Sequence, residues 1–348
     1  MTELPLQFAL TELSVEDSEG INDLSRLDHR WYEDYFGANP GNLPDFWHAK
    51  LRGDAYFTHR LWIARGPAGD QVDVPLGMAD LTLPNKEDTD QAWVEIIVPP
   101  VHRGRGVGRF LVENALRPAI EESGRSIVSF FSELVSESRE ENSLTRELGL
   151  EPKCSAHSQK LDLPLADDRF RRLRDATLQH INGYRIDGWV GEVPDEHIDL
   201  WCELVNEFSR GLPMEDFESE PPLTTPDRIR EREEKNRQTG KTFVTSVAFA
   251  KDGSLVALTQ AEVGTSASCT LALQANLIVT HAHRGHRLGM AVKLEGLRLL
   301  HEYFPNITTI ATWNSQVNVH PLGLNREIGF RQIGREVCYQ GQVQRGVV

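Results

Sequence analysis

The chain has 348 residues, 39% of them hydrophobic, which is enough for two domains that each bury a core. Its formal net charge of -15 argues against general binding to nucleic acid or to an anionic membrane, so any bound anion must be held locally. Cys154, Cys202, Cys269 and Cys338 lack the spacing of a zinc site, and no metal is expected. Because the sequence shows neither a signal-peptide pattern nor a long apolar run, we expect a cytoplasmic protein.

The first half of the chain alternates strand and helix patterns. Alternating apolar residues predict strands, and apolar residues three and four apart predict helices. In chain order we expect a strand at Phe8–Leu13, a helix capped by Ser14 and running to about Tyr35, strands at 55–64, 74–83 and 93–98 with a turn at 65–73, a helix to about Glu122, a strand at 126–134, a short helix ending at 148–150, and a strand at Ser158–Leu163.

The second half repeats this order of elements. We expect strands at 184–190, 242–250, 254–263, 269–279, 308–313 and 329–343, and helices at 194–208, at 224–240, after Gly289 and up to Ile328. A charged segment, Ala166–His180, predicts a connecting helix. The repetition predicts two tandem domains, residues 5–164 and 183–348, joined by a linker helix at 165–182.

Each half has a turn rich in glycine and arginine between a strand and a helix. The first reads RGRGVGR from Arg103 to Arg109, and the second reads RGHRLG from Arg284 to Gly289. A turn that opens a helix presents unpaired N–H groups at the positive end of the helix dipole, and glycines let an anion approach the backbone. The pattern therefore predicts two phosphate-binding loops. The alternative is a basic surface turn without a ligand.

Two familiar phosphate loops do not fit the first turn. A P-loop requires lysine and then serine or threonine after its last glycine, whereas Gly108 is followed by Arg109 and Phe110. A dinucleotide-binding fingerprint that starts at Gly104 requires glycine or alanine where Arg109 stands.

The first loop resembles the acetyl-CoA loop of the GCN5-related N-acetyltransferases (GNAT), written Q/R-x-x-G-x-G/A. RGRGVG matches every specified position, whereas the second loop matches at Arg284 and Gly289 but has Arg287 where the central glycine is usual. A right-handed backbone at Arg287 would make this departure tolerable. The segment 308–330 is similar to the fifth strand and following helix of the family, and aligning Gly149 with Gly329 places Ser138 opposite its Asn318. As a tandem pair, the chain resembles the two-domain actinobacterial acetyltransferases, the group that includes mycothiol synthase.

This resemblance implies an α/β (α+β) fold with two acyl-CoA N-acyltransferase domains, each a mixed sheet flanked by helices. The sheet would splay between its fourth and fifth strands and admit the pantetheine arm of acetyl-CoA, the cosubstrate. The residues implied to bind it are Ile97, Val98, Arg103, Gly104, Arg105, Gly106, Val107, Gly108 and Arg109 in the first half, and Ile278, Val279, Arg284, Gly285, His286, Arg287, Leu288, Gly289, Met290, Asn314 and Asn318 in the second.

Direct attack of an amine on a thioester requires a group that accepts the amine proton. Glu95, on the predicted fourth strand, is the candidate base, and its alternative role is an exposed strand carboxylate; Glu133 is a second candidate. The second half has no acid on the corresponding strand, where Gln274 and Asn276 stand. His281, His283 and His286 lie near its loop and either titrate usefully or serve as surface or phosphate-side residues.

The tyrosine that often protonates the departing thiolate in this family is missing from both halves. Thr145 and Asn325 occupy its position. Water or another tyrosine, such as Tyr339, would then donate the proton, or one half is inactive. The aromatic residues of the first half, Trp31, Tyr32, Tyr35, Phe36 and Trp47, form either core contacts or the acceptor site.

The sequence thus predicts an acetyl-CoA-dependent N-acetyltransferase that acetylates a primary amine of a small molecule, with chemistry in the first half. The acidic balance of the chain favours a cationic acceptor, and we expect no nucleic-acid or membrane partner and a monomer or homodimer. Two alternatives remain open: a tandem CoA-binding sensor or scaffold without turnover, and a protein N-acetyltransferase.

Overall fold

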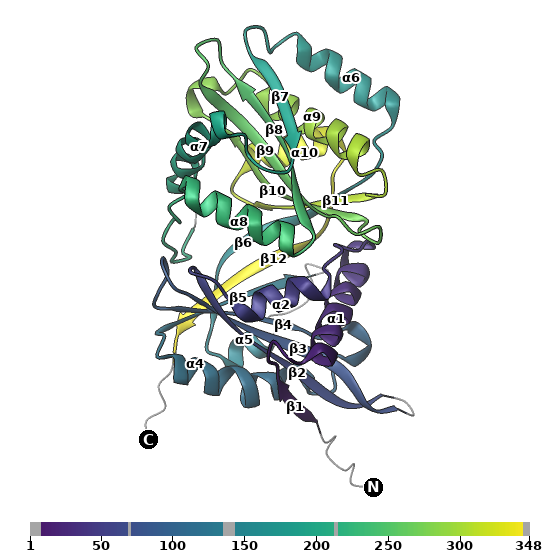
Figure 1. The fold of residues 1–348 in the computed structure, drawn as a ribbon, viewed down its shortest axis with the longest axis vertical. Helices are drawn as coiled ribbons and strands as arrows, with labels where there is room; N and C mark the ends of the chain where they lie inside the picture. The colour runs from purple at the N-terminus through teal and green to yellow at the C-terminus, as the bar shows by residue number, and fades with distance from the viewer. Residues whose placement is uncertain (1–7, 69–70, 135–142, 212–214, 344–348) are drawn as a thin grey trace.

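The computed structural model of this protein describes residues 8–68, 71–134, 143–211 and 215–343. Ser138, which the alignment of the two halves places opposite Asn318, lies outside the described residues. Within them, two lobes are stacked along the long axis of the molecule (Figure 1).

The first half follows the predicted order of elements. It comprises β1 (Ala9–Glu12), α1 (Ser18–Phe36), α2 (Pro44–Arg52), β2 (Phe57–Ala68), β3 (Gln71–Pro84), β4 (Gln91–Ile97), the 3-10 turn η1 (Pro100–His102), α3 (Val107–Leu111), the π-helical turn η2 (Val112–Leu116), α4 (Arg117–Ser123), β5 (Ile127–Leu134), α5 (Ser143–Glu147) and β6 (Glu151–Asp162).

Three details of the first half correct the sequence predictions. Asp17, not Ser14, caps α1, because its side chain accepts a 2.9 Å hydrogen bond from the Gly20 amide. Helix α2 was not predicted, although Pro44 stands at its first turn, where proline is favoured. Much of the segment expected to be a turn between β2 and β3 continues both strands as a hairpin.

The second half repeats the layout of the first. It comprises α6 (Asp167–Leu178), β7 (Arg185–Val190), η3 (Asp195–His197), α7 (Ile198–Arg210), α8 (Pro226–Gln238), β8 (Lys241–Phe249), β9 (Leu255–Gly264), β10 (Leu271–Val279), η4 (His281–His283), α9 (Leu288–Tyr303), β11 (Thr309–Ser315), α10 (Val319–Ile328) and β12 (Arg331–Gln342). Helix α6 lies where the connecting helix was predicted.

The twelve strands of the described residues form one mixed sheet in the order β1-β2-β3-β4-β5-β12-β6-β11-β10-β9-β8-β7. Two neighbouring pairs are parallel, β4 with β5 and β10 with β11, and each is short. Pairing joins Gln91–Val94 to Ile127–Phe130 in the first half and Leu271–Leu273 to Thr309–Ala311 in the second. Beyond these residues each pair separates, which confirms the expected mixed sheets that splay between their fourth and fifth strands.

The two halves exchange their last strands. Strand β12 pairs with β5 of the first half, β6 pairs with β11 of the second half, and β6 and β12 pair with each other at the centre of the sheet. In Figure 1 the yellow β12 runs into the lower lobe beside β5. The boundaries 5–164, 165–182 and 183–348 follow the chain and remain a prediction, since one sheet continues through both halves.

Helices cover both faces of the sheet in each half. In the first half, the segment α3 to α4 packs on one face around Leu111 and Leu116, and α1 and α2 cover the other face around Leu24 and Trp47. In the second half, α9 supplies Leu294 to one face, whereas α7 and α8 cover the other. Burial of these apolar stripes is the main stabilisation of the fold.

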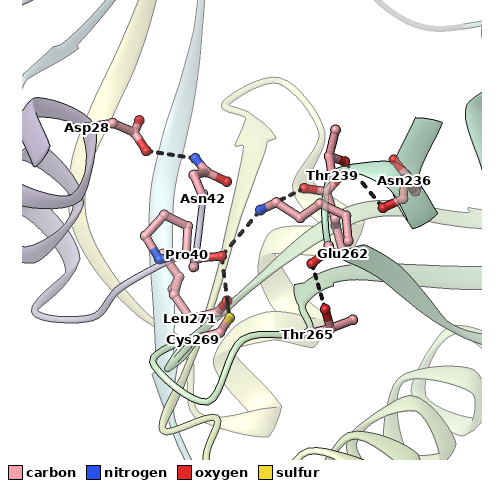
Figure 2. A network of polar contacts seen from close by, with 12 residues as sticks. Asp28, Pro40, Asn42, Asn236, Thr239, Glu262, Thr265, Cys269 and Leu271 are labelled. Atoms are coloured by element: carbon pink, nitrogen blue, oxygen red, sulfur yellow. Dashed lines mark hydrogen bonds and ion pairs between the residues drawn. The ribbon is translucent and has the colours of Figure 1, made fainter. Parts of the chain in front are cut away.

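The loop after α1 joins the halves on the side of α1 and α2. The carbonyl of Pro40 accepts hydrogen bonds from Lys241 Nζ at 3.2 Å and Cys269 Sγ at 3.4 Å (Figure 2). The carbonyl of Asn39 accepts bonds from the amides of Thr270 and Leu271 at 2.8 and 2.9 Å. The start of β10 is therefore anchored to the first half by main-chain bonds. Among the described helices, none combines the length and the apolar character that a membrane crossing requires.

The exchanged strands predict a single cooperative unfolding transition. Removing either half leaves a central strand of the other without its partner, so neither half unfolds alone. We expect one calorimetric peak for the full chain, with equal calorimetric and van't Hoff enthalpies. Two resolved peaks would contradict the energetic coupling of the halves.

Candidate functional site

A cavity of about 1310 Å3 opens where β4 and β5 separate in the first half. Its wall includes Trp93 to Val98, on β4 and directly after it, β5 residues Phe130 to Leu134, and the first arginine-glycine loop. Three lining residues, Leu273, Trp313 and Glu336, come from the second half. The strand exchange thus makes the cavity a joint product of both halves.

The backbone of the first loop forms a cradle for an anion. Gly104 and Gly106 have φ of 75° and 88°, in the left-handed region that favours glycine, and Gly106 directly precedes α3. A Cβ on Gly104 would meet no atom within 4 Å, so the space beside the loop is open. The first turn of the helix presents unpaired amides there. These features fit a pyrophosphate.

The three arginines of the loop point in different directions. Arg103 and Arg109 line the cavity, and Arg103 Nε donates to the Val98 carbonyl at 2.9 Å. Arg109 Nε donates to Glu147 Oε1 at 2.9 Å. Arg105 is absent from the lining, and its guanidinium instead bonds the Pro67 carbonyl at 2.6 Å. Of the predicted first-half ligands, Ile97, Val98, Val107 and Gly108 also line the cavity.

The second loop has the same backbone shape as the first. Gly285 has φ of 85°, and Arg287, directly before α9, has φ of 54°. The right-handed backbone considered for Arg287 is therefore wrong. A non-glycine residue in this region costs roughly 1 to 2 kcal/mol, and here its side chain pairs with Glu327. The strained residue keeps the shape that Gly106 provides in the first loop.

A further detail relates the two loops. A Cβ on Gly108 would lie 3.0 Å from Leu144 Cδ1, and a Cβ on Gly289 would lie 3.0 Å from Leu324 Cδ1. Because neither glycine has a side chain, α3 can approach α5 in the first half and α9 can approach α10 in the second. Both loops are shaped by the same packing constraint.

The other residues predicted in the second half lie around α9 and β11. Ile278, Leu288 and Met290 are buried in the core, and Val279 packs against it. His286 lies beside the Tyr184 ring, and His283 Nδ1 is 3.0 Å from the Tyr184 hydroxyl. Asn314 is 3.4 Å from Gln159 Oε1, and Asn318 precedes α10 without a side-chain capping bond. The cavity of the first half does not include these residues.

Glu95 faces the cavity from β4, directly opposite Asp80 on β3. It is open to the cavity but otherwise enclosed by protein, and this burial raises its pKa, with Lys50 opposing the shift and Asp80 adding to it. Lys50 forms an ion pair with Asp80. Burial would raise the pKa of Asp80, but Lys50 and His59 outweigh it and lower the pKa. Lys50 therefore neutralises Asp80, whereas Glu95 keeps a raised pKa.

A second pair of carboxylates lies where β5 meets β12. Glu133 and Glu336 are directly opposite each other, and both line the cavity. Glu133 accepts hydrogen bonds from the Tyr35 hydroxyl at 2.7 Å, from Ser158 Oγ at 2.8 Å and from Trp313 Nε1. Burial raises the pKa of Glu133, and burial together with the charge of Glu133 raises the pKa of Glu336 to about 8.

Tyr339 does not lie where its predicted role requires. Its ring is 3% exposed, packs in the core of the first half near Phe130, and is absent from the cavity lining. This placement argues against Tyr339 as the proton donor. The aromatic residues of the first half divide between both predicted roles: Trp31 and Tyr32 line the cavity, whereas Phe36 and Trp47 are buried in cores.

Sequence reasoning missed much of the lining, including the polar and aromatic residues Lys50, Asp80, Trp313 and Glu336. A lone aspartate in the apolar strand around Asp80 was a usable signal, because a buried carboxylate needs a partner. Trp313 and Glu336 gave no such signal. They reach the cavity only through the strand exchange, which no local pattern encodes.

The comparisons with known proteins agree with this geometry. Residues 24–138 match the model of the acetyltransferase (GNAT) family. A tandem GNAT protein from the clavulanic acid biosynthesis pathway is similar in structure, with a TM-score of 0.74, 22% identity, and coverage of 98% of this chain and 100% of the other. Residues 24–138 thus match the GNAT family, and the chain as a whole shares the fold of a tandem GNAT protein. Both findings support an N-acetyltransferase.

Two further solved structures share the fold of this chain. A GCN5-related N-acetyltransferase from Sphaerobacter thermophilus has a TM-score of 0.61 and 16% identity, over 98% of this chain and 97% of the other. The Saccharomyces cerevisiae N-myristoyltransferase with bound myristoyl-CoA has a TM-score of 0.55 and 11% identity, over 98% and 82%. No curated protein matches the sequence. The resemblance to mycothiol synthase remains a prediction.

The first loop generates a test of CoA binding. Gly106→Asp places a negative charge at the anion cradle, and we expect the CoA affinity of the first half to fall by more than about tenfold. Gly106→Asn is the matched control, because asparagine tolerates positive φ and carries no charge. Isothermal titration calorimetry measures both, with Gly289→Asp as the parallel change in the second loop. Equal affinities of the Asp and Asn variants would remove the charge-based assignment.

The raised pKa of Glu336 predicts a pH-dependent stability. Its folded-state pKa of about 8 exceeds the ordinary carboxyl value, so the folded state binds the extra proton and loses stability as pH rises toward 8. We expect Glu336→Gln to raise Tm at pH 9 by roughly 2 °C or more, and this gain to shrink as pH is lowered toward 5. Glu302→Gln, at an exposed site on α9, is the control for thermal melts across pH. A gain that does not change with pH would show that Glu336 is not the titrating group.

Proposed function

We propose that this tandem GNAT protein transfers an acetyl group from acetyl-CoA to a primary amine of a small molecule, with the chemistry in the first half. The observation that carries the proposal is one cavity that brings the first loop and Glu95 together. Acetyl-CoA supplies an activated acyl group as a thioester. The protein must hold its anionic end, admit the amine, and remove the amine proton.

The first loop is suited to holding the pyrophosphate. The open cradle at Gly104 and Gly106 gives phosphate oxygens access to backbone amides, and Arg103 adds positive charge along the same wall. Val98 and Ile97 continue this wall along β4 toward Glu95. A ligand held by the loop and extended between the separating strands reaches the carboxylate end of the cavity.

Glu95 is suited to the role of general base. A protonated amine has no lone pair, so a neighbouring group must take its proton before or during attack. The neutral amine forms the amide bond to the acetyl carbon, the thioester C–S bond breaks, Glu95 receives the amine proton, and the departing thiolate takes a proton from water. A carboxylate with a raised pKa is a better base than an ordinary one.

The second half serves a different purpose in this proposal. Its loop has the same shape, but β10 carries Gln274 and Asn276 in the region where β4 carries Glu95. It also supplies Trp313 and Glu336 to the cavity of the first half. Its role in this proposal is therefore to complete the acceptor site. A cytoplasmic location and a monomeric or dimeric state remain our predictions.

Glu95→Gln tests the assigned chemistry. We expect kcat near pH 7 to fall by roughly a hundredfold or more, with recovery at higher pH as the free amine loses its proton in solution. Thiol release from acetyl-CoA, measured across amines, amino sugars and peptides, provides the rate. Glu113→Gln, at an exposed position on the same domain, is the control. Normal rates in Glu95→Gln at pH 7 would show that Glu95 is structural.

The same assay separates the proposal from its alternatives. If calorimetry detects CoA binding but no amine in the panel gives thiol release, the protein is a CoA-binding scaffold. If peptides alone are acetylated, the acceptor is a protein. If Gly106→Asp leaves turnover intact and Gly289→Asp abolishes it, the active site lies in the second half.

A further inference from the structure

The part of the cavity around Glu95, Glu133 and Glu336, called the acceptor end below, holds more carboxyl groups than Lys50 can pair with. Its described lining includes four carboxylates, Asp80, Glu95, Glu133 and Glu336, with Lys50 as the cation beside them. Lys50 is committed to Asp80 by an ion pair. Carboxyl groups that share a cavity disfavour each other's ionised forms unless a counter-charge enters the site. Glu95, Glu133 and Glu336 have no ion pair among the described residues, so a cationic ligand would favour their ionised forms.

These carboxylates form two separate groups within the cavity. Glu95 projects from β4 on the side of Lys50 and Asp80, and the structure gives it no hydrogen bond or ion pair among the described residues. Glu133 and Glu336 project from β5 and β12, the strands on the opposite wall. Two cationic centres on one molecule can meet both groups at once, one beside Glu95 and the other beside Glu133 and Glu336.

The two carboxyl groups differ in their hydrogen bonding. Three donors from different elements, Tyr35 on α1, Ser158 on β6 and Trp313 on β11, fix the orientation of Glu133. No hydrogen bond or ion pair to Glu336 is found among the described residues, and its neighbours Glu133, Cys154 and Glu95 all disfavour its ionised form. An ammonium group between the two carboxylates would remove this repulsion.

Aromatic rings complete the wall at the same end. Trp31 and Trp313 both line the cavity. The Trp31 ring stacks on Tyr35 with centroids 5.5 Å apart and planes 2° apart, and Trp313 packs edge to face with Phe36 at 5.6 Å. Ring faces attract ammonium groups, and the attraction grows when water is excluded. Charge and aromatic surface thus point to the same class of ligand.

We infer that the acceptor is an aliphatic diamine or polyamine, whose reacting nitrogen lies near Glu95 while a second ammonium group binds between Glu133 and Glu336 beside Trp31 and Trp313. This inference rests on the proposed function and specifies its substrate class. The two sites have different tasks, because the reacting nitrogen must lose a proton and the second nitrogen keeps its charge. Holding the charged end positions the neutral end for attack.

Matched amines test the inference. Thiol release from acetyl-CoA is measured with 1,4-diaminobutane, with n-butylamine, which lacks the second charge, and with 4-aminobutanoate, which reverses it. We expect kcat/KM for the diamine to exceed that for butylamine by at least about tenfold, and the anionic amine to react slowest. In Glu336→Gln the ratio of diamine to butylamine should fall toward one. In Glu302→Gln, an exposed site on α9, it should stay at the wild-type value.

Calorimetry separates failure of this inference from failure of the proposed function. If no amine releases thiol, the proposed function fails, and binding of 1,4-diaminobutane still tests the dicationic site. We expect the diamine to bind wild-type protein at least about tenfold more tightly than butylamine, and Glu336→Gln to remove this preference. Thiol release with equal rates for diamine and butylamine, or a preference unchanged in folded Glu336→Gln, would overturn the inference while leaving the acetyltransferase assignment in place. Thermal melts establish that the variant is folded.

Discussion

The exchange of β6 and β12 is the constraint on which the rest of the structure depends. Each half builds five consecutive strands and then sends its last strand to the other half. The exchange closes the open edges of β5 and β11, where unpaired backbone groups would otherwise remain. It also fixes the register of Glu336 against Glu133 and places Trp313 within bonding distance of the same carboxylate.

The splayed parallel pairs follow from a second constraint, the need for an opening within a sheet. Where β4 and β5 stop pairing, their side chains and backbone groups face a cavity instead of a neighbouring strand. Four carboxyl groups, Asp80, Glu95, Glu133 and Glu336, line this opening, and Lys50 pairs with the first of them. Asp28, close behind it, shows the cost: burial raises its pKa to about 7 although Asn42 donates a hydrogen bond to it (Figure 2).

The sequence was sufficient to predict the local features of the site. Strand and helix patterns located most elements, and glycines at 104 and 106 indicated a turn that needs positive φ. Glu95 was found because it stands on the strand that precedes the loop. Whether it faced the cavity was not decidable, since alternation alone does not say which sheet face is the open one.

The features that sequence did not predict depend on contacts between distant segments. Nothing near Glu336 or Trp313 indicates that β12 and β11 reach the first half, because strand partners are chosen by the whole sheet. Lys50 lies on a helix whose apolar pattern was too short to recognise. Arg287 shows the limit of motif rules, since it occupies a glycine position and adopts the glycine conformation at a cost in strain.

The contacts of β6 and β12 also bear on how such a chain can arise. A dimer of identical single-domain proteins that swapped their last strands would have the same central pairing, with β6 against its own copy across a two-fold axis. In this chain the exchange takes place between two halves of one polypeptide, so the two halves can differ in sequence. Strand β12 carries Glu336, which lies opposite Glu133. Strand β6 carries Ser158, which donates a hydrogen bond to Glu133. A symmetric dimer would have to place the same residue at both positions, so the fused chain can build an asymmetric acceptor site that its symmetric counterpart cannot.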